Sequence, residues 1–123
     1  MKNAQKETTE DFIKQKELEF SEKCKEIAIE EKCGEVTFEY AKDKKTGELY
    51  VAYFKQPHEI TAARAMDVLS RGNMFEAGQM LWEGCFLRKW SSPEIESKAG
   101  IKLGMKRNVG LMLDIQLPEL KKN

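Results

Sequence analysis

The sequence predicts an α+β fold: a long N-terminal helix, one antiparallel β-hairpin, then three helices packed on it. Residues 8–32 form a highly charged stretch without proline or glycine, which is typical of a long surface helix. Residues 36–40 and 49–54 have the apolar spacing of strands, and a turn-forming segment separates them. From Pro57 onward, prolines, glycines and Asn73 divide the chain into apolar segments of helical length.

The expected first helix begins at an N-cap of Thr8 or Thr9, continues to Lys32, and ends with Gly34 as the C′ residue. Its apolar residues form one narrow stripe with spacings of seven, four and three. The stripe docks on its own domain, or it pairs with another copy or with a partner helix; the pattern leaves these alternatives open. Its members are Ile13, Phe20, Cys24 and Ile27.

A β-hairpin is expected next, because Val36, Phe38 and Tyr40 alternate with polar residues. Residues 43–47 suit a turn, and Gly47 can supply a positive φ. The return strand, 49–54, is apolar on both faces, so both faces should be at least partly covered. A two-stranded hairpin is marginal in water, so it needs helices on a face or strands from another copy on its edge.

Two short helices follow the hairpin. The first is expected over 59–71 and stops at Gly72, and Asn73 is a suitable N-cap for the second, over 74–86. The second is apolar almost all round and should be the most buried element. Its two glycines, Gly78 and Gly84, each cost helix propensity, and close approach of another backbone is a reason to tolerate them.

The last helix is expected to begin at Ser92 and Pro93 and to reach about Leu113, after a loop in which Trp90 is partly exposed. Gly100 and Gly104 form a G-x-x-x-G, which we interpret as a tight helix crossing rather than an interaction motif. The length of 123 residues indicates a single domain over 1–123, with 1–8 and 118–123 expected to be loose.

Composition argues against several classes of function. The 21 basic and 21 acidic side chains cancel, which argues against a nucleic-acid binder that depends on phosphate contacts. Residues 1–35 are net acidic and residues 98–123 net basic; this indicates either solvated helix faces or association through opposite charges. No apolar run is long enough to span a bilayer and no secretory signal is present, so a cytoplasmic protein without membrane contact is expected.

No catalytic, metal or cofactor motif stands out, so we expect a protein that is not an enzyme and has no cofactor. His58 is the sole histidine, and its position beside a proline at a helix start favours a capping or exposed role. The three cysteines, Cys24, Cys33 and Cys85, lack metal-site spacing and are expected to be reduced and inert.

One family resemblance extends the interpretation. The segment GELYVAYFKQPHEITAARAM, joined to LSRGNMFEAGQMLWEGCFL, resembles the small tail assembly chaperones of tailed phages and prophages, particularly those of gut Bacteroidetes phages. The similarity covers about residues 48–120. His58 departs from it, because Ser or Thr is expected at that helix cap. The matching residues are Tyr53-Phe54-Lys55-Gln56-Pro57, Gly72-Asn73, Trp82 and Gly84-Cys85.

The resemblance implies a non-enzymatic protein that binds the tape measure protein, or another phage tail protein, during tail assembly in the host cytoplasm. Such a protein keeps that long helical chain soluble, is often a homo-oligomer, and is absent from the finished virion. The alternative is a small virion structural or adaptor protein that acts by protein–protein interaction. The candidate partner-binding residues are the first-helix stripe, Ile13, Phe20 and Ile27, together with Met74, Phe75 and Trp90.

Overall fold

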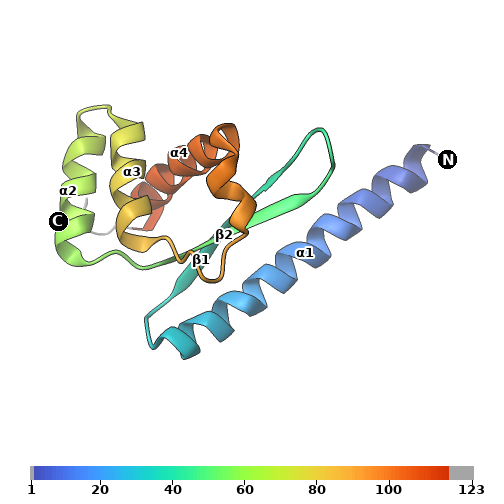
Figure 1. Cartoon of the computed structure of the whole chain (residues 1–123), viewed down its shortest axis with the longest axis horizontal. Coiled ribbons are helices and arrows are strands. Elements are labelled where there is room, and N and C mark those ends of the chain that lie inside the picture. Colours follow the sequence, from blue (N-terminus) through green and yellow to red (C-terminus); the bar gives the residue numbers. More distant parts are fainter. Residues whose placement is uncertain (1, 117–123) are drawn as a thin grey trace.

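A computed structural model describes the backbone of residues 2–116 and the side chains of residues 10–109. The expected α+β order is confirmed: a long first helix, an antiparallel two-stranded hairpin, and three further α-helices (Figure 1). The expected looseness of residues 118–123 lies outside the described residues. The elements are α1 (Lys2–Glu31), β1 (Val36–Lys42), β2 (Leu49–Lys55), α2 (Glu59–Ser70), α3 (Met74–Cys85), a 3₁₀ helix, η1 (Pro93–Ser97), and α4 (Ala99–Gln116).

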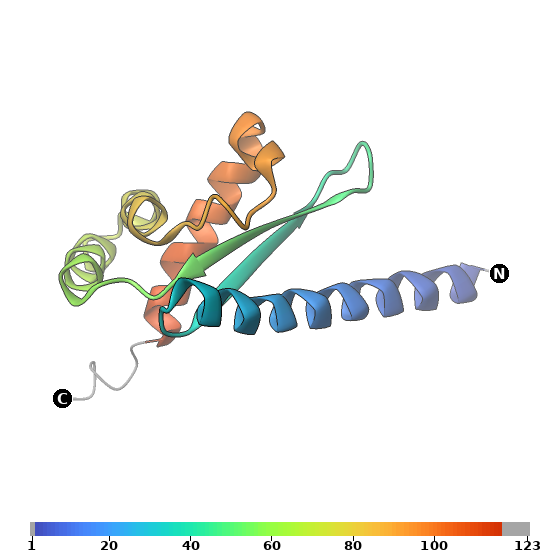
Figure 2. The ribbon, with the colours of Figure 1, turned by 60° about the horizontal axis from the view of Figure 1, so that its bottom comes forward.

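The hairpin is the middle layer of the fold. Figure 2 shows α1 on one side of the two strands and α4 on the other, with α2 and α3 beside α4 on that same side. Tyr50, Ala52 and Phe54 of β2 face the cluster formed by α2, α3 and α4, whereas Tyr53 packs with α1. Both faces of the hairpin are therefore covered by helices of the same chain, as its two-sided apolar pattern predicts.

The ends of α1 differ from expectation. The helix begins at Lys2 rather than at Thr8 or Thr9, and the residue with a left-handed backbone after its end is Lys32 (φ 53°), not Gly34. The N–H of Lys32 donates to the carbonyl of Ile29, and the N–H of Cys33 donates to that of Ala28. These are the two bonds of a Schellman motif, and they hold Lys32 in a conformation that usually favours glycine.

The connection between α2 and α3 agrees with the sequence. Gly72 adopts a positive φ of 84° after α2. The side chain of Asn73 accepts a hydrogen bond from the N–H of Glu76 at 3.1 Å and donates one to its carboxylate at 2.8 Å. His58 occupies the N-cap position of α2 but makes no side-chain capping bond there. The most buried side of α3 is formed by Ala77, Gly78, Leu81, Trp82 and Cys85.

The expectation of a single helix from Pro93 to Leu113 is wrong, because the helix is interrupted at Lys98, between η1 and α4. The hydroxyl of Ser92 does not cap a helix; it accepts a hydrogen bond from the N–H of Val51. The sequence places Val109 and either Lys102 or Leu103 on the apolar side of this helix. Val109 and Met105 are buried, whereas Leu103 is 54% exposed.

The interpretation of Gly100 and Gly104 as a tight crossing is also wrong. A Cβ added at either glycine would meet no atom within 4 Å in the part of the chain that the structure describes. The close helix crossing lies instead at Gly78 of α3, which contacts the backbone of α4. Within residues 2–116 we find no helix that combines the length and the hydropathy required to cross a bilayer.

Candidate protein-interaction surface

The middle and C-terminal part of α1 docks on the hairpin through the predicted stripe. Ile27 has no exposed surface and Cys24 is 7% exposed, and both pack against Val36 of β1 and Tyr53 of β2. Burial raises the pKa of the Cys24 thiol to about 11, with a smaller contribution from the negative charge of Glu35. This part of the stripe is satisfied within the domain and is not a free surface on a single chain.

An aromatic row continues the contact toward the hairpin loop. Phe20 of α1 lies 5.5 Å from Phe38 and 5.9 Å from Tyr40, measured between ring centroids. The hydroxyl of Tyr40 donates to the carboxylate of Glu17 at 2.7 Å, and that bond is the main cause of the raised pKa of Tyr40. Phe38 and Tyr40 were expected only as strand residues, but they make the sheet side of this row.

Trp90 connects the segment after α3 to α1. Its indole N–H donates to the carboxylate of Glu31 at 2.7 Å. The ammonium groups of Lys23 and Lys89 lie 5.0 and 5.1 Å from the ring centroid, within the range of a cation–π attraction. The ring packs on the same cluster that holds Ile27.

The structure separates the predicted partner-binding residues into two groups. Phe20, Ile27 and Trp90 belong to one cluster between α1 and the hairpin, where Ile27 is buried and the other two are partly buried. Ile13 is partly buried farther along α1. Met74 and Phe75 lie instead in the first turn of α3, in the other helical layer, where Phe75 is 53% exposed.

Two open grooves flank α1. We call the one on the β2 side the hairpin groove; its volume is about 570 Å³, and Phe12 at its mouth is 49% exposed. From the sequence, Phe12 only widens the stripe of the first helix and is not among the candidate partner-binding residues. Its spacing of four and eight from Lys16 and Phe20 nevertheless places all three on one row of a helix. The hairpin groove is lined by Phe12, Lys16, Phe20, Thr46, Gly47, Glu48, Leu49, Tyr50, Ser92 and Glu94.

We call the second groove, on the β1 side of α1, the edge groove. Its volume is about 530 Å³. One wall is formed by α1, mostly by small side chains together with Lys25, and the other by Glu35 and the start of β1. No residue of β2 lines it, so it opens beside the outer edge of β1. Its lining residues are Ser21, Cys24, Lys25, Ala28, Glu35, Val36, Thr37 and Phe38.

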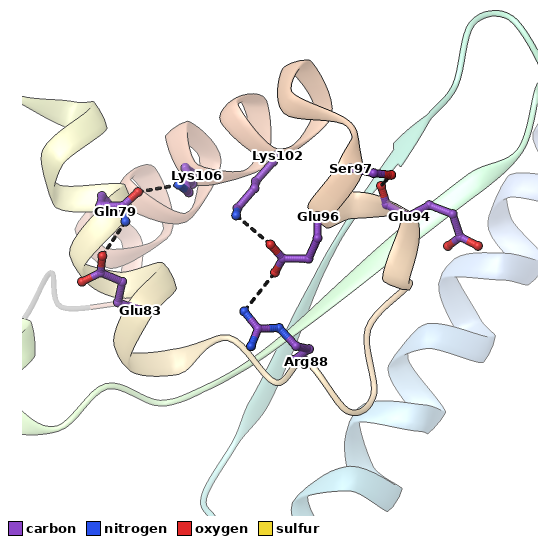
Figure 3. A network of polar contacts seen from close by, with 8 residues as sticks. All are labelled: Gln79, Glu83, Arg88, Glu94, Glu96, Ser97, Lys102 and Lys106. Atoms are coloured by element: carbon purple, nitrogen blue, oxygen red, sulfur yellow. Dashed lines mark hydrogen bonds and ion pairs between the residues drawn. The ribbon is translucent and has the colours of Figure 1, made fainter.

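A third, more polar pocket of about 330 Å³ lies between α3 and α4, over the ring of Trp82. Figure 3 shows Glu96 between Lys102 of α4, at 2.8 Å, and Arg88, at 3.3 Å. Both contacts lower the pKa of the Glu96 carboxyl group, and the hydrogen bond from Lys102 is the largest cause. On its other side, Lys106 donates to Gln79. The cations therefore already have acceptors within the chain, and the network fastens η1 and the segment before it to α4.

Among the described residues, no group of three or more His, Cys, Asp or Glu side chains is placed to hold a metal ion. Cys24 and Cys85 are buried free thiols and Cys33 is a partly exposed one. No family model, no curated protein and no solved structure matches this chain.

Proposed function

We propose that this protein is a non-enzymatic chaperone of the phage-tail type, which binds the tape measure protein through the hairpin groove during tail assembly in the host cytoplasm. The observation that supports it best is the row formed by Phe12, Lys16 and Phe20 along the groove. Phe12 leaves half of its surface exposed there, and an exposed aromatic at the mouth of a groove favours a protein-binding surface.

The shape of the groove suits a helical partner. One wall is α1 and the other is the hairpin loop with the segment around Ser92, so an amphipathic helix could lie beside α1 and insert its apolar side chains between them. Figure 1 shows the N-terminal part of α1 projecting past the hairpin loop, which extends the surface available to a long partner. Lys16, Glu48 and Glu94 supply charges of both signs around the groove, which can fix the register of such a helix.

The test is co-expression with the tape measure protein, followed by measurement of its soluble fraction and of the complex by size-exclusion chromatography with light scattering. Phe12→Asp places a charge at the mouth of the hairpin groove and should reduce the soluble tape measure protein several-fold. Leu18→Asp is the matched control, because Leu18 is 67% exposed on the side of α1 that faces away from the sheet. Both variants should melt at the temperature of the wild type, since neither residue is in the core.

Two results would contradict the proposal. If the wild-type chain leaves the tape measure protein insoluble and forms no complex, the chaperone function is wrong. If Phe12→Asp and Leu18→Asp bind equally well, the assignment to the hairpin groove is wrong. Stoichiometric amounts of the chain in finished particles would favour the virion structural or adaptor role instead.

A further inference from the structure

The two outer edges of the hairpin differ in whether the rest of the chain forms hydrogen bonds with them. On β2, the N–H groups of Val51 and Tyr53 donate to the hydroxyls of Ser92 and Ser91, each at 3.0 Å. Their carbonyls accept from the N–H groups of Ser92 and Leu87, at 2.8 and 2.9 Å. The segment after α3 therefore closes this edge completely around Val51 and Tyr53.

The edge of β1 has no such cover. Phe38 and Tyr40 lie opposite Tyr53 and Val51 in the antiparallel register. Because those two β2 residues bond outward, their partners on β1 also direct N–H and C=O outward. The same alternation applies to Val36 and Lys42. Among the described groups, the backbone of residues 2–116 and the side chains of residues 10–109, these outward backbone groups have no hydrogen-bond partner. An uncovered edge of this kind is a template for pairing with another strand.

We infer that β1 pairs antiparallel with β1 of a second copy, so that the two hairpins form one four-stranded sheet across a twofold axis. This inference concerns the edge groove and does not depend on the chaperone function. A second strand along β1 would cover the mouth of the edge groove. Ser21 and Ala28, which line that groove on α1, are small and leave room for its side chains.

Side-chain chemistry selects one register. The outward-bonding residues of β1 must pair with outward-bonding residues of the second copy. This condition admits registers centred on Thr37, Phe38, Glu39 or Tyr40. Centring the axis on Phe38 places that ring opposite Phe38 of the second copy, and Val36 opposite Tyr40 of the second copy. These are the aromatic and aromatic–β-branched pairs that stabilise sheets. Centring it on Thr37 would place Glu35 opposite Glu39, and centring it on Glu39 would place two Glu39 carboxylates opposite each other. Centring it on Tyr40 would place Lys42 opposite Phe38.

The charges at the ends of β1 agree with an antiparallel pair. Glu35 and Lys42 are both exposed and flank the strand at opposite ends. In the Phe38-centred register, Lys42 of one copy lies opposite Gly34 of the second copy, beside its Glu35. The same contact is made twice because the axis is twofold. A parallel arrangement would instead bring like charges together at each end.

Substitution of Thr37 tests both the interface and its register, because Thr37 faces Glu39 of the second copy. Thr37→Glu places like charges opposite each other twice per dimer, and Thr37→Lys places opposite charges there. Light scattering over a concentration series of the whole chain should show a dimer for the wild type. The dissociation constants of the two variants should differ by roughly tenfold, with the lysine variant tighter. Thermal melts of both variants show whether either substitution unfolds the chain, so that a weaker dimer is not mistaken for a loss of folding.

Amide hydrogen exchange gives a second readout that does not depend on a variant. The N–H groups of Phe38 and Tyr40 should become protected as the protein concentration rises, whereas those of Val51 and Tyr53 should be protected at every concentration. A chain that stays monomeric throughout, or a dimer that Thr37→Glu and Thr37→Lys affect equally, would overturn the inference. The inference would also be overturned if the amide of Phe38 became protected only when the tape measure protein is added, whatever the concentration of this chain.

Discussion

Gly78 of α3 lies directly against the backbone carbonyl of Lys106 of α4, and a Cβ at position 78 would overlap the carbonyl oxygen and carbon of Lys106. The obstacle is backbone rather than the flexible end of a side chain, so it cannot rotate away. This contact sets how closely the two helices pack over the core that contains Leu81, Trp82 and Met105.

Gly78→Ala should therefore destabilise the protein although alanine is the better helix former. The added methyl group would force α3 and α4 apart, and overpacking of this kind costs about 1–3 kcal/mol in the free energy of unfolding. Gly104→Ala is the matched control, since a Cβ there meets nothing within 4 Å. It should stabilise α4 by about 1 kcal/mol. Urea unfolding of both variants measures the difference, and equal effects of the two substitutions would contradict the close contact at Gly78.

The glycines show which part of the packing was predictable. Close approach of a backbone was offered for both Gly78 and Gly84, because each costs helix propensity in an apolar helix. It is found at Gly78, whereas a Cβ at Gly84 would meet only the side chain of Thr61. The G-x-x-x-G of α4 misled because small residues at this spacing permit a tight crossing but do not require one. Among the described atoms, a Cβ at either glycine meets none within 4 Å. Hydrophobic periodicity finds a helix and its buried side, but it does not reveal where a tertiary contact interrupts the helix.

Ser91→Ala should destabilise the protein by about 1–3 kcal/mol, because it leaves a buried backbone N–H without an acceptor. The hydroxyl of Ser91 accepts from the N–H of Tyr53 at 3.0 Å and donates to the carbonyl of Leu87 at 2.8 Å. Amide exchange at Tyr53 should become faster in the variant. Ser97→Ala is the control: Ser97 also donates to a carbonyl, that of Glu94, but it is exposed and satisfies no other group. Equal losses of stability would show that the Tyr53 bond contributes nothing specific.

The role of Ser91 and Ser92 could not be read from the sequence. Ser92 followed by proline has the sequence pattern of a helix N-cap. In the structure its hydroxyl instead accepts a hydrogen bond from the N–H of Val51, which is distant in the chain. Capping motifs predict which groups can accept a hydrogen bond, and the tertiary fold decides which donor reaches them.

The candidate site was also predictable only in part. The stripe on α1 was found from its spacing, and the alternatives of docking or partner binding could not be resolved from that spacing. In the structure the stripe docks at Ile27, while Phe12, outside the strict stripe, remains half exposed in the hairpin groove. A helical pattern identifies the apolar face of α1, but the length of the hairpin determines how much of that face is covered.

The three cysteines should differ in reactivity in the folded protein. Cys33 is partly exposed after the end of α1, whereas Cys24 and Cys85 are buried. Because the thiolate is the reactive form, burial suppresses alkylation both by blocking access and by raising the pKa of Cys24 and Cys85 to about 11. At neutral pH, mass spectrometry should find one maleimide adduct, at Cys33, within minutes, and the other two only on unfolding. Rapid labelling of Cys85 would contradict its placement in the core.

The same burial predicts a loss of stability at alkaline pH. Burial raises the pKa of Cys24 and Cys85 from 9.0 to about 11, and that of Tyr53 from 10.0 to about 12. Between those values the unfolded chain releases protons that the folded chain retains, so the free energy of unfolding falls as pH rises. The stabilisation is fully present below about pH 8 and is lost progressively from pH 9 to 11. Melting temperatures across this range should fall steadily, and they should fall less steeply in Cys24→Ala and Cys85→Ala than in the control Cys33→Ala. A slope that both buried substitutions leave unchanged would mean that neither thiol is responsible for the alkaline loss.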